Sequence, residues 1–168
     1  MKRIIPILAA GIITATAVYA SRINYETAPI RAAPAPAVTT ETKYTPEELE
    51  TLAIIIYQEA GADSIPDYIR EYVGCVVLNR VEHPEFPDTI QEVATQKQQW
   101  GSLYWTGIQW PERASLPTEV HAVERARECA KKLPETTSRP VPRNVIWCAE
   151  FPQGSGTWLH SDGIYFCY

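Results

Sequence analysis

The feature that most constrains this chain is a helical segment that is apolar on nearly every side, residues 45–61 (TPEELETLAIIIYQEAG). Thr45 and Glu48 have the spacing of a capping box, with Pro46 in the first turn. Gly61 is the expected stop. A helix that is apolar all round has to be enclosed by other elements. The segment therefore predicts the central helix of a helical core.

One acidic residue, Glu59, stands at the end of this apolar run. On a helical wheel it lies about 20° from Leu52, at the edge of the apolar stripe. A carboxyl in such a place has its charged form disfavoured, so its pKa rises and it becomes a candidate proton donor near neutral pH. The alternative is a structural glutamate whose charge meets Arg70 or Arg80. The residues alone leave both interpretations open.

The remaining pattern predicts an α+β fold, mostly helical with a small C-terminal antiparallel sheet or hairpin. We expect a helix over residues 67–81, a short helix capped by Asp88, and a third from Pro117 to just before Pro134. Two short runs rich in aromatic and β-branched residues, 144–151 and 163–168, predict neighbouring strands. The segment between them is rich in turn-forming residues.

The N-terminal part is read as targeting and spacer sequence. Residues 1–20 combine a basic start, an apolar run to Val18 and a small-residue cleavage signal at Ala20, which predicts an export signal. An uncleaved membrane anchor is the alternative. Residues 21–43 form an Ala/Pro-rich linker. The working domain is then 44–168, and it is expected outside the cytoplasm, secreted or anchored through its N-terminus.

The working domain is acidic, with eighteen Asp and Glu against ten Lys and Arg. It has no basic stripe, which argues against nucleic acid as a partner. Its four cysteines are an even number in an exported chain and suggest two disulfides. Cys148 and Cys167 lie in the two strand-like runs, which leaves Cys75 with Cys129. Neither a CxxC pair nor a neighbouring histidine supports a metal site.

An aromatic segment, residues 96–112, contains three tryptophans and four glutamines. Trp100, Trp105 and Trp110 could form an exposed platform on which sugar rings stack. They could equally pack under the loop as a small core. Both interpretations stay open.

Taken together, several motifs resemble the SleB-type cell wall hydrolases, which include the spore-cortex-lytic enzymes. The resemblance covers about Leu49 to Tyr168. The motifs that carry it are IYQEAG (56–61), VGCVVLNRV (73–81), FPDTIQEV (86–93), Gln99-Trp100 and YFCY (165–168). The chain departs from the family pattern after Gly61, where GADSIPDYIREY replaces the usual Gly-Glu-Pro turn.

The resemblance implies a lysozyme-like fold that cleaves peptidoglycan between N-acetylmuramic acid and N-acetylglucosamine. It implies Glu59 as the catalytic acid, with Gln99 and Trp100 as substrate contacts. Tyr57 and Asn79 are further candidates, and the alternative for Asn79 is a structural role in orienting the backbone. No metal or cofactor is required, and the expected state is a monomer.

The acids nearest in sequence to Glu59, which are Asp63, Asp67 and Glu71, are expected as caps or solvated charges rather than as a second catalytic carboxylate. With one acid, the muramic 6-hydroxyl can act as the nucleophile, which is the lytic transglycosylase route. The alternatives are a hydrolytic muramidase with a second carboxylate and a non-catalytic wall-binding module. A peptidase using a free thiol beside His121 or His160 is a further alternative.

Overall fold

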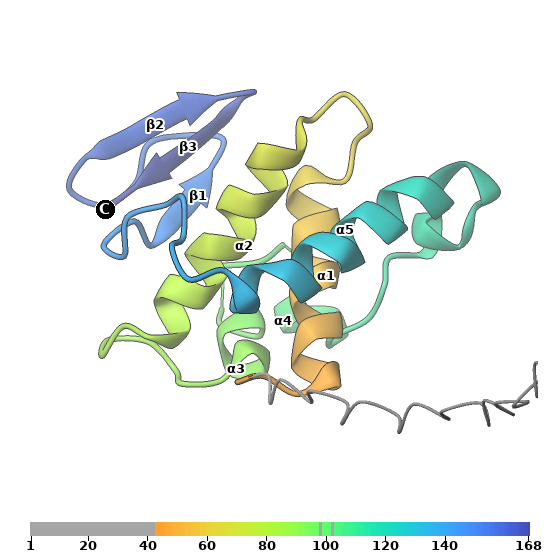
Figure 1. Ribbon diagram of the computed structural model, residues 1–168, viewed down its shortest axis with the longest axis horizontal. Helices are drawn as coiled ribbons and strands as arrows, with labels where there is room; N and C mark the ends of the chain where they lie inside the picture. Colours follow the sequence, from red (N-terminus) through yellow and green to blue (C-terminus); the bar gives the residue numbers. More distant parts are fainter. Residues whose placement is uncertain (1–42, 98, 102) are drawn as a thin grey trace, which may run out of the picture. The chain divides into compact units, whose positions relative to one another are not determined.

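The computed structural model describes residues 43–97, 99–101 and 103–168 (Figure 1). The predicted export signal and nearly all of the linker lie outside the described residues. Within the described part, no helix is both long and apolar enough to span a bilayer. The elements are α1 (Pro46–Ala60), α2 (Asp67–Val81), α3 (Ile90–Ala94), α4 (Leu103–Thr106), the 3₁₀ turns η1 (Glu112–Ser115) and η2 (Pro117–Glu119), α5 (Val120–Lys132), η3 (Leu133–Glu135), β1 (Trp147–Ala149), β2 (Thr157–Ser161) and β3 (Ile164–Cys167).

Helix α1 is the centre of the fold, as its composition predicts. The capping box forms: the Thr45 hydroxyl accepts from the Glu48 amide at 3.2 Å, and the Glu48 carboxylate accepts from the Thr45 amide at 2.9 Å. Every residue from 51 to 57 is buried. Helices α2, α3 and α5 pack around it (Figure 1). The α+β class is confirmed.

Helix α2 has the predicted bounds and lies very close to its neighbours. A Cβ added at Gly74 would stand 2.3 Å from Leu133 Cδ1 and 3.0 Å from Ile56 Cδ1. Only glycine permits this approach. The contact brings α2 against both α1 and η3.

Two helix starts differ from the expectation. The short helix is capped by Thr89 instead of Asp88, because the Thr89 hydroxyl accepts from the Glu92 amide at 3.2 Å. Pro117 opens the 3₁₀ turn η2, and the α-helical part begins only at Val120. Both differences are local and leave the order of elements as predicted.

The sheet has three antiparallel strands in the order β1-β3-β2. The two predicted strands, β1 and β3, are neighbours. The segment expected to be turns contains β2, which pairs with β3 across a tight turn at Asp162 (φ 50°) and Gly163 (φ 81°). Positive φ at both central residues is what a two-residue hairpin turn of type I′ requires. The Gly, Ser and Pro residues that flank this strand are typical of turns, so the sequence did not predict the strand.

The two predicted disulfides are absent, since all four cysteines are free thiols in the structure. In the β1–β3 register, Cys148 faces Phe166 and Cys167 faces Trp147. Residues adjacent along a strand point to opposite faces of the sheet, so these two thiols project from opposite sides. Cys75 and Cys129 are buried on α2 and α5 without being linked.

The turn between α1 and α2 is held by one buried side chain, Arg70. Its guanidinium donates to the carbonyl of Ala62 at 2.8 Å and also to the carbonyls of Ile65 and Gly61. The guanidinium also forms an ion pair with the Asp67 carboxylate at 3.3 Å. Arg70 therefore fixes the path of the chain just after Glu59.

We predict that Arg70→Met lowers the free energy of unfolding by about 3 kcal/mol, because the turn carbonyls lose their donor. Urea denaturation of the full chain measures this change. The control is Arg125→Met, which removes a surface ion pair to Asp67 and is expected to cost less than about 1 kcal/mol. Equal losses in the two variants would contradict the role given to Arg70.

Candidate active site

A cleft of about 730 Å³ opens at the C-terminal end of α1. Its walls come from four places: the end of α1 and the following turn, the η1 and η2 segments, the residues at the end of β1, and the β2–β3 hairpin. Glu59 lies in this cleft. The lining residues are Gln58, Glu59, Gly61, Ala62, Ile65, Arg113, Glu119, Ala149, Glu150, Asp162, Gly163 and Ile164.

The Glu59 side chain is half-buried and has an unusual pKa. Burial, with a smaller contribution from the negative charge of Glu150, raises its pKa from 4.5 to about 7. Among the described residues, no side chain forms an ion pair or hydrogen bond with its carboxyl. The ion pair to Arg70 or Arg80 that the structural alternative requires is not formed, because Arg70 is engaged with turn carbonyls and Arg80 donates to the Ile146 carbonyl at 2.6 Å.

Glu150 is the cleft carboxylate that the sequence did not single out. It follows β1 directly, is exposed, and lines the same cleft as Glu59. The sequence feature that could have identified Glu150 is its position as an acid at the end of the apolar run VIWCA. It was missed because about ninety residues separate it from Glu59, and only the tertiary structure, in which β1 packs against α2, brings both residues to one cleft.

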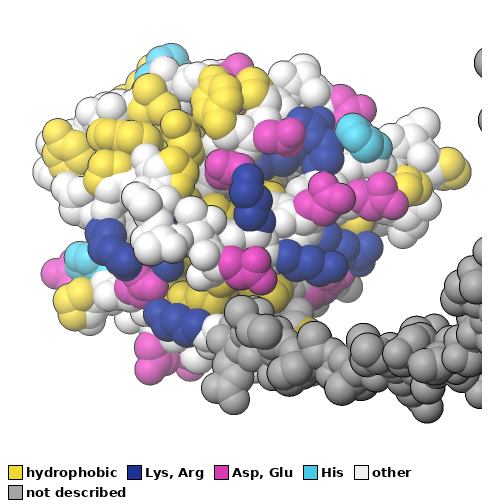
Figure 2. Space-filling view, viewed as in Figure 1, with side chains coloured by type: hydrophobic (Ala, Val, Ile, Leu, Met, Phe, Trp, Pro, Cys, Tyr) yellow, Lys and Arg dark blue, Asp and Glu magenta, His cyan; other side chains and the backbone are white. Residues whose placement is uncertain are grey.

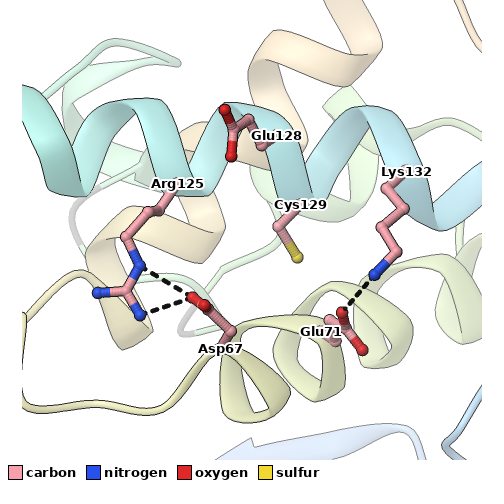
Figure 3. A pocket seen from close by; sticks show the side chains of 6 residues that line it. All are labelled: Asp67, Glu71, Arg125, Glu128, Cys129 and Lys132. Carbon is pink, nitrogen blue, oxygen red and sulfur yellow. Dashed lines mark hydrogen bonds and ion pairs between the residues drawn. The ribbon is translucent and has the colours of Figure 1, made fainter.

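The acids nearest to Glu59 in sequence lie outside this cleft, and two of them line a separate pocket between α2 and α5 (Figure 3). Asp67 accepts from Arg125 at 2.6 Å, and Glu71 accepts from Lys132 at 3.1 Å. Asp63 lies 3.7 Å from His121. The Asp67–Arg125 and Glu71–Lys132 contacts are solvated ion pairs, as expected for these acids. Their charges are matched by bases on α5.

Charges on the visible face of the domain follow the same pattern. Figure 2 shows Lys and Arg side chains beside Asp and Glu, without a continuous basic surface. The Glu50–Arg127 pair, at 2.6 Å, is one example.

Tyr57 supports the wall of the cleft from inside the protein. It is fully buried, and its hydroxyl donates to the Glu119 carboxylate at 2.6 Å. The Arg113 guanidinium lies 5.0 Å from the centre of its ring. Both Arg113 and Glu119 line the cleft, so Tyr57 positions lining residues without lining the cleft itself.

The other predicted substrate contacts are not among the residues that line the cleft. Asn79 is buried and donates to the carbonyls of Pro142 and Val145 at 2.8 and 2.9 Å, so it anchors the backbone before β1. Trp100 is buried, with the Arg80 guanidinium 5.0 Å from its ring centre. Gln99 lies half-buried in the turn before Trp100.

The three tryptophans of the aromatic segment do not share one role: two pack in a small core under the loop, and one is exposed. Trp100 is buried, and Trp110 packs 5.5 Å from the Tyr57 ring while its indole NH donates to Glu50 at 2.8 Å. These two belong to the core under the loop. Trp105 is 75 % exposed and contacts Tyr104 edge-to-face, so only this pair is available as a surface platform.

The geometry does not support a peptidase with a cysteine thiol as its nucleophile. Burial raises the pKa of Cys75 to about 11 and that of Cys129 to about 12, and it also raises the pKa of Cys148. These thiols remain protonated and weakly nucleophilic at neutral pH. His121 instead faces Asp63. In the described part of the chain, no cluster of three or more His, Cys, Asp or Glu side chains is arranged to hold a metal ion.

We predict that Glu59→Gln stabilises the fold at pH 8 but not at pH 4. As pH rises from 4.5 to about 7, the unfolded chain releases the Glu59 proton while the folded chain keeps it, so folding loses up to about 3 kcal/mol. Glutamine removes this loss. Urea unfolding at both pH values measures it, with Glu71→Gln as a surface control. A variant that is destabilised equally at both pH values would contradict the raised pKa.

In a comparison with protein families, a family model described as Cell Wall Hydrolase matches residues 69–164. No curated protein and no solved structure matches the chain. The matched range includes most of α2, most of the sheet and Glu150, and it begins after Glu59. Because it spans more than half of the sequence, the chain belongs to the cell wall hydrolase family, of the SleB type.

Proposed function

We propose that this protein cleaves the glycosidic bond between N-acetylmuramic acid and N-acetylglucosamine as a lytic transglycosylase, with Glu59 as the general acid and base. Family membership gives the coarser statement: the chain is a hydrolase-family enzyme that acts on peptidoglycan, which implies work outside the cytoplasm. The observation that supports the finer proposal is an unpaired carboxyl with a pKa near 7 in an open cleft.

A pKa near 7 suits both halves of this reaction. Protonated Glu59 donates its proton to the bridging oxygen as the bond from that oxygen to the anomeric carbon of the muramic residue breaks. The resulting carboxylate then accepts the proton of the muramic 6-hydroxyl as this oxygen attacks the anomeric carbon. The products are a new sugar hydroxyl and a 1,6-anhydro muramic end, without consumption of water.

The cleft has a suitable size and lining for a glycan strand. Its volume of about 730 Å³ lies within the range of ligand sites. Gln58 contributes an amide, and the turn after α1 contributes backbone groups beside Glu59. Of the residues that the structure describes, Arg113 is the one basic side chain that lines this cleft. Binding therefore depends on shape and hydrogen bonds more than on capture by positive charge.

A second candidate function is a hydrolytic muramidase, and one observation favours it: the Glu150 carboxylate shares the cleft with Glu59. If Glu150 activated water, the products would carry reducing muramic ends. A non-catalytic glycan-binding module is the remaining alternative. Such a module would be indifferent to the loss of the Glu59 proton.

We predict that Glu59→Gln lowers the turnover of purified sacculi by about 10³-fold, because glutamine cannot transfer the proton. The full chain is incubated with sacculi, and mass spectrometry identifies the muropeptide ends. Wild-type protein is expected to release anhydro ends, and the variant is expected to bind sacculi without releasing them. Glu71→Gln, which removes an acid outside the cleft, serves as the control.

Two results would contradict this proposal in different ways. Near wild-type release by Glu59→Gln would eliminate Glu59 as the acid. Reducing ends from the wild-type enzyme would instead favour the hydrolytic muramidase.

A further inference from the structure

We propose that Glu150 is the second carboxylate of the reaction and faces the anomeric carbon of the bound sugar. There its negative charge would stabilise the positive charge that develops as Glu59 releases its proton. This inference rests on the function proposed above and adds a named residue with a distinct role. Glu150 takes no proton and forms no covalent bond in it, so the proton balance of the reaction is unchanged.

The first argument is position. Glu59 is the second-last residue of α1, and Glu150 is the first residue after β1, yet both line one cleft. They enter it from different elements, one from the helical core and one from the sheet. A glycan strand in the cleft is in reach of both carboxyls, as a glycosidic bond must be in enzymes that use two carboxylates.

The second argument is availability. Among the described residues, four carboxyl groups line the cleft, and the protein itself engages two of them in hydrogen bonds. Glu119 accepts from Tyr57 at 2.6 Å, and Asp162 accepts from Tyr68 at 2.8 Å and from Ser161. Among the described residues, none donates a hydrogen bond to the Glu59 or Glu150 side chain. These two carboxyls are therefore the ones left to interact with substrate.

The third argument is the contrast in environment. Glu59 is half-buried and Glu150 is exposed, and the charge of Glu150 is one cause of the raised Glu59 pKa. The two groups therefore interact across the cleft. Glycosidases often use two carboxyl groups in different surroundings. One group keeps its proton and acts as the acid, and the other stays charged. Here burial favours the protonated form of Glu59, whereas Glu150 is exposed to solvent.

Other charged groups also face the cleft, and they are the same in wild type and in the variants at position 150. Arg113 and Glu119 come from the η1 and η2 segments, and Asp162 comes from the β2–β3 turn. Behind the wall, the Cys148 thiol is held protonated by burial, and Arg80 lies near it. None of these groups changes in a variant at position 150, so a shift in the pH profile reports the charge of Glu150.

The experiment compares Glu150→Gln, Glu150→Asp and the control Glu85→Gln, which removes an exposed acid outside the cleft. We measure kcat and KM on soluble glycan strands across pH, using the full chain. For Glu150→Gln we expect kcat to fall about 100-fold, the size of effect seen when one electrostatic stabiliser is removed, with KM nearly unchanged. The control is expected to match wild type.

The pH profile separates this role from a purely structural one. Without the like charge at 150, Glu59 loses its proton at lower pH, so the alkaline limb of the kcat profile moves to lower pH. Glu150→Asp keeps the charge and is expected to keep that limb while restoring part of kcat. Thermal unfolding followed by circular dichroism verifies that each variant folds.

The outcomes distinguish this inference from the function on which it rests. If Glu59→Gln is inactive while Glu150→Gln has wild-type kcat and an unmoved pH profile, the role of Glu150 is overturned and the proposed function stands. If Glu59→Gln is active, both fail. Reducing muramic ends that disappear in Glu150→Gln would assign Glu150 to water activation and overturn the role proposed here.

Discussion

The enclosure of α1 is the interaction on which the rest of the structure depends. A helix with every residue from 51 to 57 buried needs partners on all sides, and α2, α3 and α5 supply them. The same enclosure shapes the chemistry at its end. Because the apolar surroundings continue to the last turn, Glu59 is half-buried and its pKa is raised to about 7. The enclosure of α1 therefore explains both the packing of the core and the raised pKa of the candidate acid.

The cleft is built where the helical core meets the sheet. Arg70 fixes the turn after α1 by donating to its carbonyls, and Asn79 and Arg80 fix the chain before β1 in the same way. These three side chains are buried and polar, and each is engaged by backbone carbonyls. They hold the two walls that carry Glu59 and Glu150. The buried polar residues of α2 thus position the cleft without lining it.

The helical part of the fold was predictable from local patterns. The capping box at Thr45 and the bounds of α2 follow from spacing alone, and the resemblance of the motifs agrees with the family match over residues 69–164. Strand β2 was not predictable, because its pairing with β3 overrides a composition typical of turns. The disulfides were inferred from cysteine number, which contains no information on which face of a strand each thiol occupies.

The sequence by itself determined the central helix, the α+β class and the candidate acid Glu59, since each depends on residues close together along the chain. Only the tertiary structure decided which groups share the cleft with that acid. It engages Arg70 and Arg80 with backbone carbonyls, buries Asn79 and Trp100, and places Glu150 in the lining of the same cleft as Glu59. The physical reason is that contacts between a helix end and a distant strand depend on packing, which local periodicity does not encode.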